Sequence, residues 1–341
     1  MGKKFIDTVK FSERLRARGI RSEEKKLLVT NFHGTDQERD LTEPANCNGF
    51  GRIRHFRLHT DHGWPENPLP LEPALKALKL PSAEVLRAQV FQNAICNWRC
   101  WYCYVDFDLL SANPKFASFL TVSELVDLYL AEKDRPQVID LSGGQPDLIP
   151  EWVPWMMREL EARGLAKKTY LWSDDNLSND YFWQFLSDAD HSLICNYHNY
   201  GKVCCFKGFN AESFSFNTGA PPDLFEQQFL LMEQQLALGI DIYCYTTFTG
   251  PSSKHVRDDM ANFVDRLQEL DPMLPLRTIP LKIKVFSPTK KRQGSIASLV
   301  LDSQESAIDI WNNELLGRFT SDHLKTRISA IPLRNRSVSA E

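Results

Sequence analysis

The sequence predicts an α/β fold in which a mostly parallel sheet curves into a partial barrel. Six strand-like segments alternate with helical segments between residues 85 and 290, and this alternation is typical of right-handed β-α-β units. A cysteine-rich loop and a glycine-rich turn follow the first two of these strands. Parallel sheets place their chemistry at this edge, beyond the carboxyl ends of the strands. The 341 residues suffice for one such core with extensions.

The composition is that of an ordinary soluble globular protein, with a formal net charge of −4. This balance gives no global attraction to nucleic acid or to an anionic membrane. Eight cysteines in a chain of this length suit a reducing compartment rather than a disulfide framework. The first residues lack the apolar run of a secretory signal, Ile6 stands where a myristoylation motif has Ser or Thr, and no apolar run approaches the length of a membrane span. We therefore expect a cytoplasmic protein.

Residues 1–84 are interpreted as an N-terminal extension or cap. They contain a short basic helix near 11–21, an alternating strand at 52–58 with one face in water, a proline-rich loop at 60–70 and a short helix at 73–80. Four residues of this region, His55, His59, Asp61 and His62, could form a second metal site. Because their spacing matches no known ligand pattern, surface histidines are the preferred interpretation.

The first core strand, at 85–91, leads directly into a loop with three cysteines. Cys96, Cys100 and Cys103 have the spacing C-x3-C-x2-C, and three thiolates this close can hold three corners of an iron–sulfur cube. No fourth cysteine follows nearby, so the four-cysteine ferredoxin pattern is not met and one iron would remain open to a ligand that is not protein. A zinc site and plainly buried thiols are the alternatives.

The second core strand, at 137–141, ends in the turn Ser142-Gly143-Gly144-Gln145-Pro146. A helix starting after Thr121, with Glu124 completing a capping box, precedes it. The two glycines allow positive φ and close approach of the backbone to a ligand, and Pro146 favours an extended Gln145. An ordinary turn from strand to helix is the alternative.

The third and fourth strands, at 169–172 and 202–207, follow helix 151–164 and the ambiguous segment 181–199. After the third strand, Ser173, Asp175 and Asn176 could bind a ribose or a carboxylate, or could simply cap the next helix. Lys207 could face the interior of the barrel, where its ammonium would need a carboxylate or a ligand, or it could lie in solvent at the strand end.

The fifth and sixth strands are expected at 241–247 and 281–286, on either side of helix 258–270, and helix 223–238 precedes them. Lys282 and Lys284 share one face of the sixth strand and could meet a substrate anion or solvent. Residues 291–341 are expected to form a C-terminal helical segment, with a helix at 304–316 and a polar, frayed tail from Leu333. The four cysteines that follow the motif could hold an auxiliary cluster or be buried structural thiols; they are Cys195, Cys204, Cys205 and Cys244.

At two of these features the sequence resembles the radical S-adenosylmethionine (radical SAM) superfamily. The family carries C-x3-C-x2-C with an aromatic residue before the last cysteine, here Tyr102, and a Gly-Gly-Glu-Pro motif after the next strand. In this chain Gln145 replaces the glutamate, so an acceptor oxygen remains but its charge is lost. A looser pattern, from Lys207-Gly208 to Thr218-Gly219-Ala220, resembles the glycyl-radical-enzyme-activase branch.

The resemblance covers residues 85–290 and implies a (β/α)6 core, which is an incomplete TIM barrel. It implies a [4Fe-4S] cluster on Cys96, Cys100 and Cys103, with S-adenosyl-L-methionine on the open iron. Residues at the expected cofactor site are Tyr102, Gly143, Gly144, Gln145, Pro146, Ser173, Asp175, Asn176 and Lys207. Reductive cleavage of S-adenosylmethionine would give a 5′-deoxyadenosyl radical that abstracts hydrogen from a substrate, with a flavodoxin- or ferredoxin-like protein as electron donor.

The substrate is not determined by the sequence, and no catalytic residue is singled out. A protein or peptide and a small molecule both remain open, whereas nothing indicates a nucleic acid. The alternative function is a non-catalytic regulator or scaffold in which the cysteines hold zinc or an iron–sulfur cluster. No cysteine follows Cys244, so the chain lacks the multi-cysteine C-terminal extension that some radical SAM peptide-modifying enzymes carry.

Overall fold

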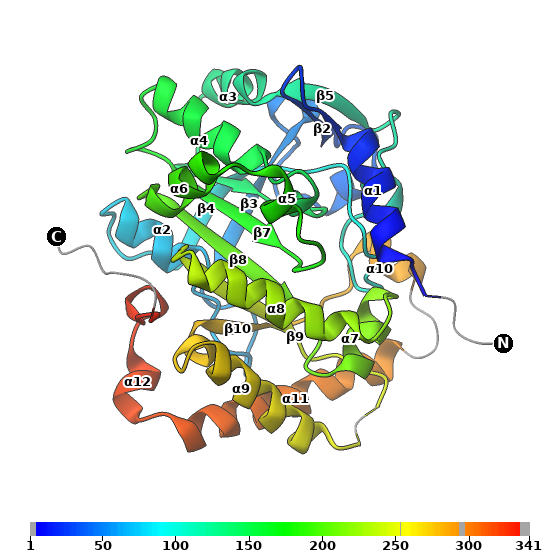
Figure 1. Cartoon of the computed structure of the whole chain (residues 1–341), viewed down its shortest axis with the longest axis vertical. Coiled ribbons are helices and arrows are strands. Elements are labelled where there is room, and N and C mark those ends of the chain that lie inside the picture. The colour runs from blue at the N-terminus through cyan, green and yellow to red at the C-terminus, as the bar shows by residue number, and fades with distance from the viewer. Residues whose placement is uncertain (1–4, 253, 293–296, 335–341) are drawn as a thin grey trace.

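The computed structural model describes residues 5–252, 254–292 and 297–334. Its main sheet has seven strands in the order β10-β9-β8-β7-β6-β4-β3. In chain order these strands are β3 (Gly51–Arg57), β4 (Val85–Phe91), β6 (Val138–Leu141), β7 (Tyr170–Asp175), β8 (Tyr200–Phe206), β9 (Ile242–Thr247) and β10 (Thr278–Leu281). From β4 to β10 the neighbours are parallel, and only β3 joins antiparallel. The sheet curls through the middle of the molecule (Figure 1) as an incomplete α/β barrel, which confirms the predicted fold class.

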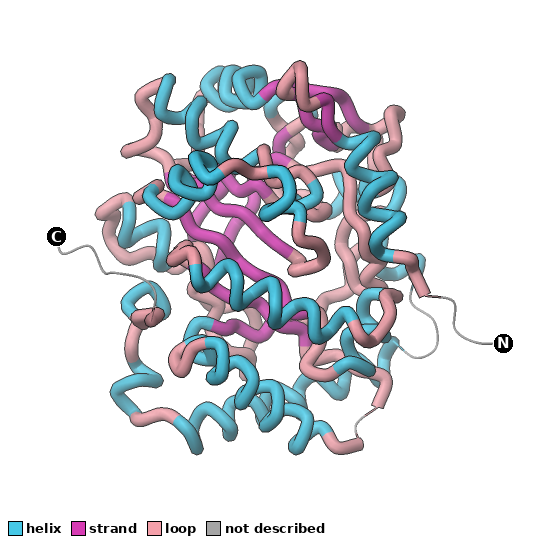
Figure 2. Tube along the Cα trace, viewed as in Figure 1, coloured by secondary structure: helices cyan, strands magenta, loops and turns pink. Residues whose placement is uncertain are grey.

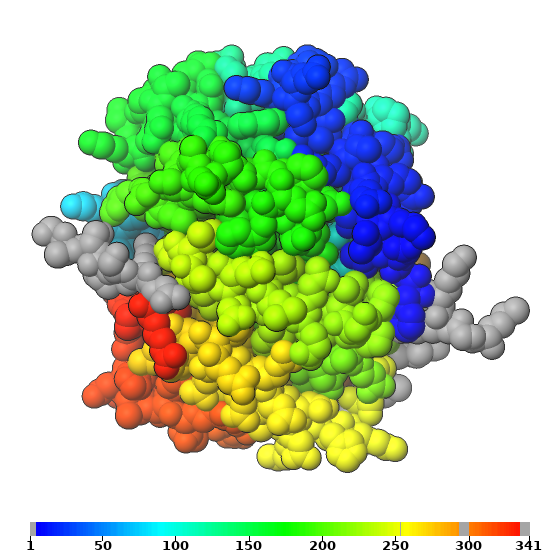
Figure 3. Space-filling view, in the orientation of Figure 1, coloured from blue at the N-terminus to red at the C-terminus, as the bar shows by residue number. Residues whose placement is uncertain are grey.

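Helices cover the outer face of this sheet (Figure 2). They are α3 (Val122–Ala131), α4 (Trp152–Ala162), α5 (Tyr181–Phe185), α6 (Asp188–Asn196), α7 (Ala211–Thr218), α8 (Leu224–Ala237) and α9 (Val256–Leu270). Their apolar side chains pack with outward residues of the strands, such as Leu141, Leu171 and Phe206, in the larger hydrophobic core. In the space-filling view these helices close over the strands completely (Figure 3). This packing removes the outer face of the sheet from water.

The inner face carries a second, smaller core. Trp172, Val203 and Tyr243 project from adjacent strands and pack with Phe56 of β3. The helix α2 (Leu71–Ala77) and the short helix η6 (Ile328–Ala330) close this end through residues that include Ala74 and Ile328. The inner face is therefore apolar at the amino ends of the strands, and its polar residues lie nearer the carboxyl ends.

Residues 1–84 contribute more to the core than a cap would. Strand β3 pairs with β4 along its whole length, from Gly51↔Phe91 to Arg57↔Val85. Helix α1 (Thr8–Gly19) runs along the right-hand side of the view in Figure 1, and a second sheet consists of β1 (Ile20–Arg21), β2 (Lys26–Thr30) and β5 (Ala117–Thr121). This small sheet escaped prediction because β1 and β5 are short and lie almost 100 residues apart in the chain.

Most predicted elements are found within a few residues of their expected bounds. The capping box before α3 is present: Glu124 N–H donates to Thr121 Oγ1 over 3.1 Å, and Thr121 N–H donates to Glu124 Oε2 over 2.7 Å. The ambiguous segment 181–199 is helical, as α5 and α6. The sixth strand was placed too late, since β10 ends at Leu281 and residues 282–286 have no regular structure.

The C-terminal segment is more ordered than predicted in its described part. Helix α11 (Ala297–Arg318) packs along α9, with Trp311 buried against Phe248 and Phe263. The helices α10 (Ser287–Arg292) and α12 (Ser321–Lys325) flank it. Leu333 is buried in the main core, and the tail predicted beyond it falls outside the described residues, as do the first four residues. No helix among the described residues combines the length and apolarity needed to cross a membrane.

Candidate functional site

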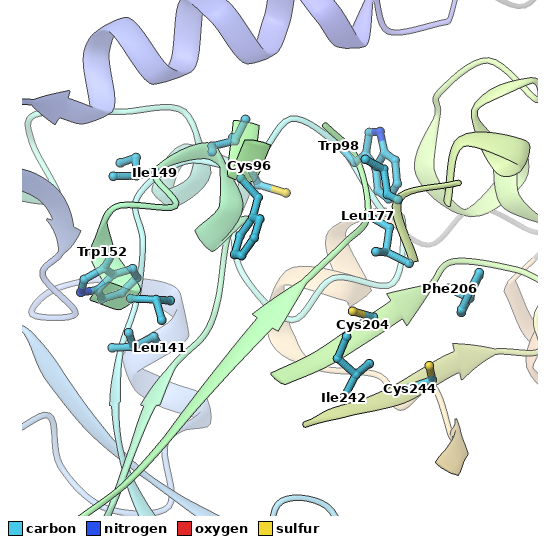
Figure 4. Packing of buried hydrophobic residues seen from close by; sticks show 14 of the residues in the cluster. Cys96, Trp98, Leu141, Ile149, Trp152, Leu177, Cys204, Phe206, Ile242 and Cys244 are labelled. Atoms are coloured by element: carbon cyan, nitrogen blue, oxygen red, sulfur yellow. The ribbon is translucent and has the colours of Figure 1, made fainter. Parts of the chain in front are cut away.

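The three motif cysteines lie in the loop that follows β4, at the carboxyl edge of the sheet. Cys96 and Cys100 are buried and Cys103 is partly exposed. Burial raises the pKa of all three thiols, that of Cys100 to about 12. Cys103 further raises the pKa of Cys96, and both raise that of Cys100, so the three thiols are near neighbours. Figure 4 shows Cys96 between Ile149 and Trp98, facing the inside of the fold.

The backbone of the cysteine loop is hydrogen-bonded to the last residues of α7. Arg99 N–H donates to Thr218 O and Trp101 N–H donates to Asn217 O, each over 3.1 Å. Trp101 Nε1 also donates to Asn217 Oδ1 over 3.0 Å. These bonds attach the cysteine loop to the C-terminal end of α7, at Asn217 and Thr218.

Three cations surround the cysteines. Lys207 lowers the pKa of each motif thiol, Arg99 acts on Cys96 and Cys103, and Arg292 of α10 acts on Cys103. The guanidinium of Arg292 donates to the carbonyl oxygens of Cys103 over 2.6 Å and Val105 over 2.5 Å. Positive charge near a thiol favours the thiolate, which is the form that binds metal. The donor set and its charges therefore fit an anionic metal cluster on three thiolates.

The described residues contain no group of three His, Cys, Asp or Glu side chains arranged around a point that a single metal ion could occupy. The N-terminal histidines are used otherwise: His55 Nε2 lies 3.0 Å from Glu43, His59 Nδ1 lies 3.6 Å from Glu66, and Asp61 pairs with Lys282.

The glycine turn after β6 lies directly against the cysteine loop. Gln145 N–H donates to Ile95 O over 2.8 Å, and Asn93 Nδ2 donates to Gln145 O over 2.9 Å. Gly144 has φ +70°, and a Cβ there would lie 2.4 Å from Ile95 O. Gly143, with φ +81°, similarly faces the side chain of Gln92. The two motifs form one structural unit, and packing against the loop requires both glycines.

Gln145 is fully buried, and both polar atoms of its amide are used inside the protein. Nε2 donates to Asp175 Oδ1 over 2.8 Å, and Oε1 accepts from Asn176 N–H over 2.9 Å. Asp175 also accepts from Gln235 Nε2 over 2.7 Å and from Leu177 N–H over 2.8 Å. Burial would raise the pKa of Asp175, but Lys202 and these hydrogen bonds outweigh burial and lower it. Gln145 and Asp175 thus connect the turn to the end of β7.

The other residues expected after β7 differ in where they point. Ser173 lies on the outer face, where its hydroxyl is 2.8 Å from Tyr200 Oη. Asn176 Nδ2 is 3.7 Å from Cys96 Sγ, within the range of an N–H···S hydrogen bond. Asn176 is thus brought to the cysteines, whereas Ser173 and the carboxylate of Asp175 are engaged elsewhere. Their roles toward a cofactor stay predictions.

Tyr102 and Lys207 meet at the inner side of the loop. The register from Cys205 to Tyr245 places Lys207 on the inner face, two residues beyond Cys205. Burial alone would lower the pKa of Lys207, but Cys205, Tyr102, Cys100 and Cys96 raise it. Among the residues that the structure describes, no carboxylate forms an ion pair with its ammonium. Tyr102 Oη lies 3.4 Å from Thr247 Oγ1.

Of the four cysteines that follow the motif, three lie on strands and are divided between the two faces of the sheet. Cys204 and Cys244 are register partners on adjacent strands, buried under the outer helices (Figure 4), whereas Cys205 faces inward. Cys195 lies on α6 and packs against the main core. The strands thus point Cys205 away from Cys204 and Cys244, which favours structural thiols over an auxiliary cluster.

Sequence reasoning missed most of a set of polar and charged residues on the inner face, of which it had singled out only Lys207. We call Arg52, Arg54, Asp140, Ser142, Asp174 and Lys207 the inner polar cluster; Arg52 and Asp140 face the same side through their register with Val90. The strand at 52–58 was expected to turn its polar face to water, but that face is turned into the barrel. One signal was available, because Asp140 is the only charged residue in the otherwise apolar strand β6.

Comparison with known proteins gives only distant similarity. No family model and no curated protein matches the chain. Among solved structures, Streptococcus suis SuiB bound to S-adenosylmethionine is 14% identical over 68% of this chain and 48% of that chain, with a TM-score of 0.44. SuiB bound to its precursor peptide SuiA is 13% identical over 62% and 45%, with a TM-score of 0.38. The aligned part spans less than half of each SuiB chain, and at this level of similarity no property of SuiB is transferred.

Proposed function

We propose that the protein is a radical SAM enzyme, with a [4Fe-4S] cluster on Cys96, Cys100 and Cys103 and S-adenosylmethionine beside it. The single observation that carries the proposal is the contact between the two motifs. The Gly143–Gly144 turn donates to and accepts from the cysteine loop through Gln145. A three-cysteine loop and a glycine turn joined in this way at the carboxyl edge of a partial barrel are what the motif resemblance implies.

In this proposal the residues of the chain hold the cluster, shield it from water and balance its negative charge. Cys96 and Cys100 are buried, and Arg99, Lys207 and Arg292 offset the negative charge of three thiolates. Asn176 donates toward the sulfur of Cys96, and hydrogen bonds to sulfur tune the potential of such clusters. When bound, the cluster supplies the electron for reductive cleavage of S-adenosylmethionine to a 5′-deoxyadenosyl radical. A flavodoxin- or ferredoxin-like donor is the expected source of that electron.

The proposal stops at the superfamily and does not extend to the activase branch. The residues behind that finer resemblance have local structural roles in this fold. Asn210 Oδ1 caps α7 by accepting from Ser213 N–H over 2.7 Å, and Gly219 ends α7 with φ +74°. Helix capping explains these residues without a shared substrate.

Anaerobic reconstitution tests the proposal. The protein should take up about four irons and four sulfides per chain and form 5′-deoxyadenosine from S-adenosylmethionine when dithionite is added. Cys100→Ala should lose most of the iron, whereas Cys195→Ala, at a cysteine outside the loop, should keep it. Stoichiometric zinc without sulfide, or a cluster that never cleaves S-adenosylmethionine, would favour the non-catalytic alternative.

A further inference from the structure

The inner polar cluster contains a buried carboxylate whose oxygens have no hydrogen-bond donor. Asp140 is fully buried in β6, between Ile139 and Leu141. Within the described part of the chain, neither of its oxygens accepts a hydrogen bond of ordinary length and angle. Burial raises the pKa of Asp140, and Arg54 and the nearby Ser142 hydroxyl only oppose that rise. The nearest cation is Arg54, whose Nη1 lies 3.8 Å from Oδ2. A buried carboxylate without donors costs more free energy than a neutral polar group, so this position suits a ligand that brings donors.

Two further polar groups of the cluster have no hydrogen bond of ordinary length and angle to a described residue. One is the fully buried hydroxyl of Ser142, two residues beyond Asp140 on the same face. The other is the buried Nε of Arg52 on β3, which β4 separates from β6. Arg52 Nη2 donates to Tyr104 Oη over 3.0 Å. Tyr104 follows Cys103 directly, so this bond joins the inner polar cluster to the cysteine loop.

The other charges of the cluster lie on the next two strands. Asp174 on β7 and Lys207 after β8 are both partly exposed, and in the described residues neither forms an ion pair. Neighbouring strands lie about 4.8 Å apart, so Asp140, Asp174 and Lys207 extend over roughly 10 Å. In the order of the strands, Asp174 and Asp140 lie on the adjacent strands β7 and β6, with Lys207 on the side of β8 and Arg54 on the opposite side, on β3. Arg54 already pairs with Asp140, so Lys207 is the cation of the cluster that has no ion pair among the described residues.

We propose that the inner polar cluster binds a small zwitterion, of the size of an α-amino acid. Its ammonium group would donate to Asp140 and Asp174, and its carboxylate would accept from Lys207 on the neighbouring strand, with Ser142 as a further neutral contact. That this ligand is the enzyme's substrate rests on the proposed function; its binding does not.

Other ligand classes satisfy only part of the cluster. A phosphate or other pure anion would meet Lys207 but would be repelled by Asp140 and Asp174 and leave the oxygens of Asp140 without donors. A neutral polyol would donate to Asp140 but leave Lys207 unpaired. Only a molecule with both signs of charge completes the hydrogen bonds and balances the charges together.

Equilibrium dialysis of the full chain against three probe mixtures tests this inference. The probes are the free protein-forming L-amino acids, the same set N-acetylated, which removes the cation, and the same set as amides, which removes the anion. At least one free amino acid should be retained, and its two blocked forms should bind at least tenfold more weakly. Retention of blocked and free forms alike, or of none, would overturn the inference.

Asp140→Asn provides the decisive variant because its two effects have opposite signs. Removing a buried charge should raise the melting temperature of the free protein, yet weaken binding of the retained amino acid at least tenfold. Asp188→Asn, at an exposed position on α6, is the control and should change neither. Unchanged binding in Asp140→Asn would show that water alone satisfies this carboxylate and would contradict the inference.

The two proposals can fail separately. A variant with Ala at positions 96, 100 and 103 should still retain the amino acid, because the inner polar cluster does not include the cysteines. If binding persists but the reconstituted protein never forms 5′-deoxyadenosine, the radical SAM proposal fails and the zwitterion site stands. If 5′-deoxyadenosine forms but no zwitterion is retained, the zwitterion site fails and the radical SAM proposal stands.

Discussion

The side-chain amide of Gln145 donates from Nε2 to Oδ1 of Asp175 over 2.8 Å, in a fully buried position. This bond explains why a glutamine stands where the resembling family has glutamate. A glutamate would place two carboxylates at hydrogen-bond distance in the core. The identity of residue 145 is thus set by Asp175 on the neighbouring strand.

Gln145→Glu should therefore destabilise the protein by about 2–4 kcal/mol near pH 7, measured by chemical denaturation. Gln184→Glu is a matched control, because Gln184 Nε2 also donates to an aspartate, Asp180, over 2.7 Å but on the surface. Water screens that pair, so its variant should be close to wild type. Adding Asp175→Asn should recover part of the stability of Gln145→Glu. Equal stability of the two single variants would contradict this account.

Gly144→Ala should displace the cysteine loop. A Cβ there would lie 2.4 Å from Ile95 O and 2.6 Å from Asn93 O, both backbone atoms. Gly164→Ala is the control, since Gly164 has a similar φ of +67° but no atom within 4 Å of the added Cβ. The control should lose only about 1–2 kcal/mol of stability, because alanine is strained in the left-handed backbone conformation. Gly144→Ala should lose more, and should also bind less iron after reconstitution; identical losses would show that strain alone matters.

Lys202→Met should be strongly destabilising, by about 3–5 kcal/mol. Its ammonium is buried under the outer helices, 2.6 Å from Asp147 Oδ2 and 3.5 Å from Asp175 Oδ2. Removing the cation leaves two buried carboxylates facing each other. Lys26→Met, which breaks an exposed ion pair of 2.8 Å with Glu24, should change the unfolding midpoint little. A small effect of Lys202→Met would mean that Asp147 is protonated in the native state.

Ionisation of Asp174 should lower the stability of the protein as the pH rises from about 4 to 7. Burial, and then Asp140, raise the pKa of Asp174 to about 7, against the opposing effect of Arg54 and Lys207. A carboxyl with a raised native pKa binds its proton more tightly when folded, so its ionisation destabilises the fold. Asp174→Asn should therefore raise the melting temperature at pH 8 by several degrees and by less at pH 5. If Asp174→Asn raised the melting temperature by the same amount at pH 5 and pH 8, the raised pKa of Asp174 would be contradicted.

The sequence located most of the fold because periodicity is a local property. The strands at 85–91, 241–247 and 137–141 were found almost to the residue, and so was the capping box of Thr121 and Glu124. The sixth strand was misplaced because 282–286 alternates as a strand would. Its lysines instead pair with side chains from distant segments, Lys282 with Asp61 and Glu305.

The sequence predicted the parts of the candidate site that consist of residues close together in the chain. It did not predict the parts in which the strands bring distant residues together. The three cysteines and the glycine turn are short motifs, and the sequence by itself determined them and their place after the first two strands. Only the tertiary structure decided three other features of the site. The glycine turn contacts the cysteine loop, Gln145 donates a hydrogen bond to Asp175, and Arg52, Arg54 and Asp140 face inward. The physical reason is register: the pairing of distant strands fixes which side chains share a face, and residues 52 and 140 come to the same face only when both strands pair with β4.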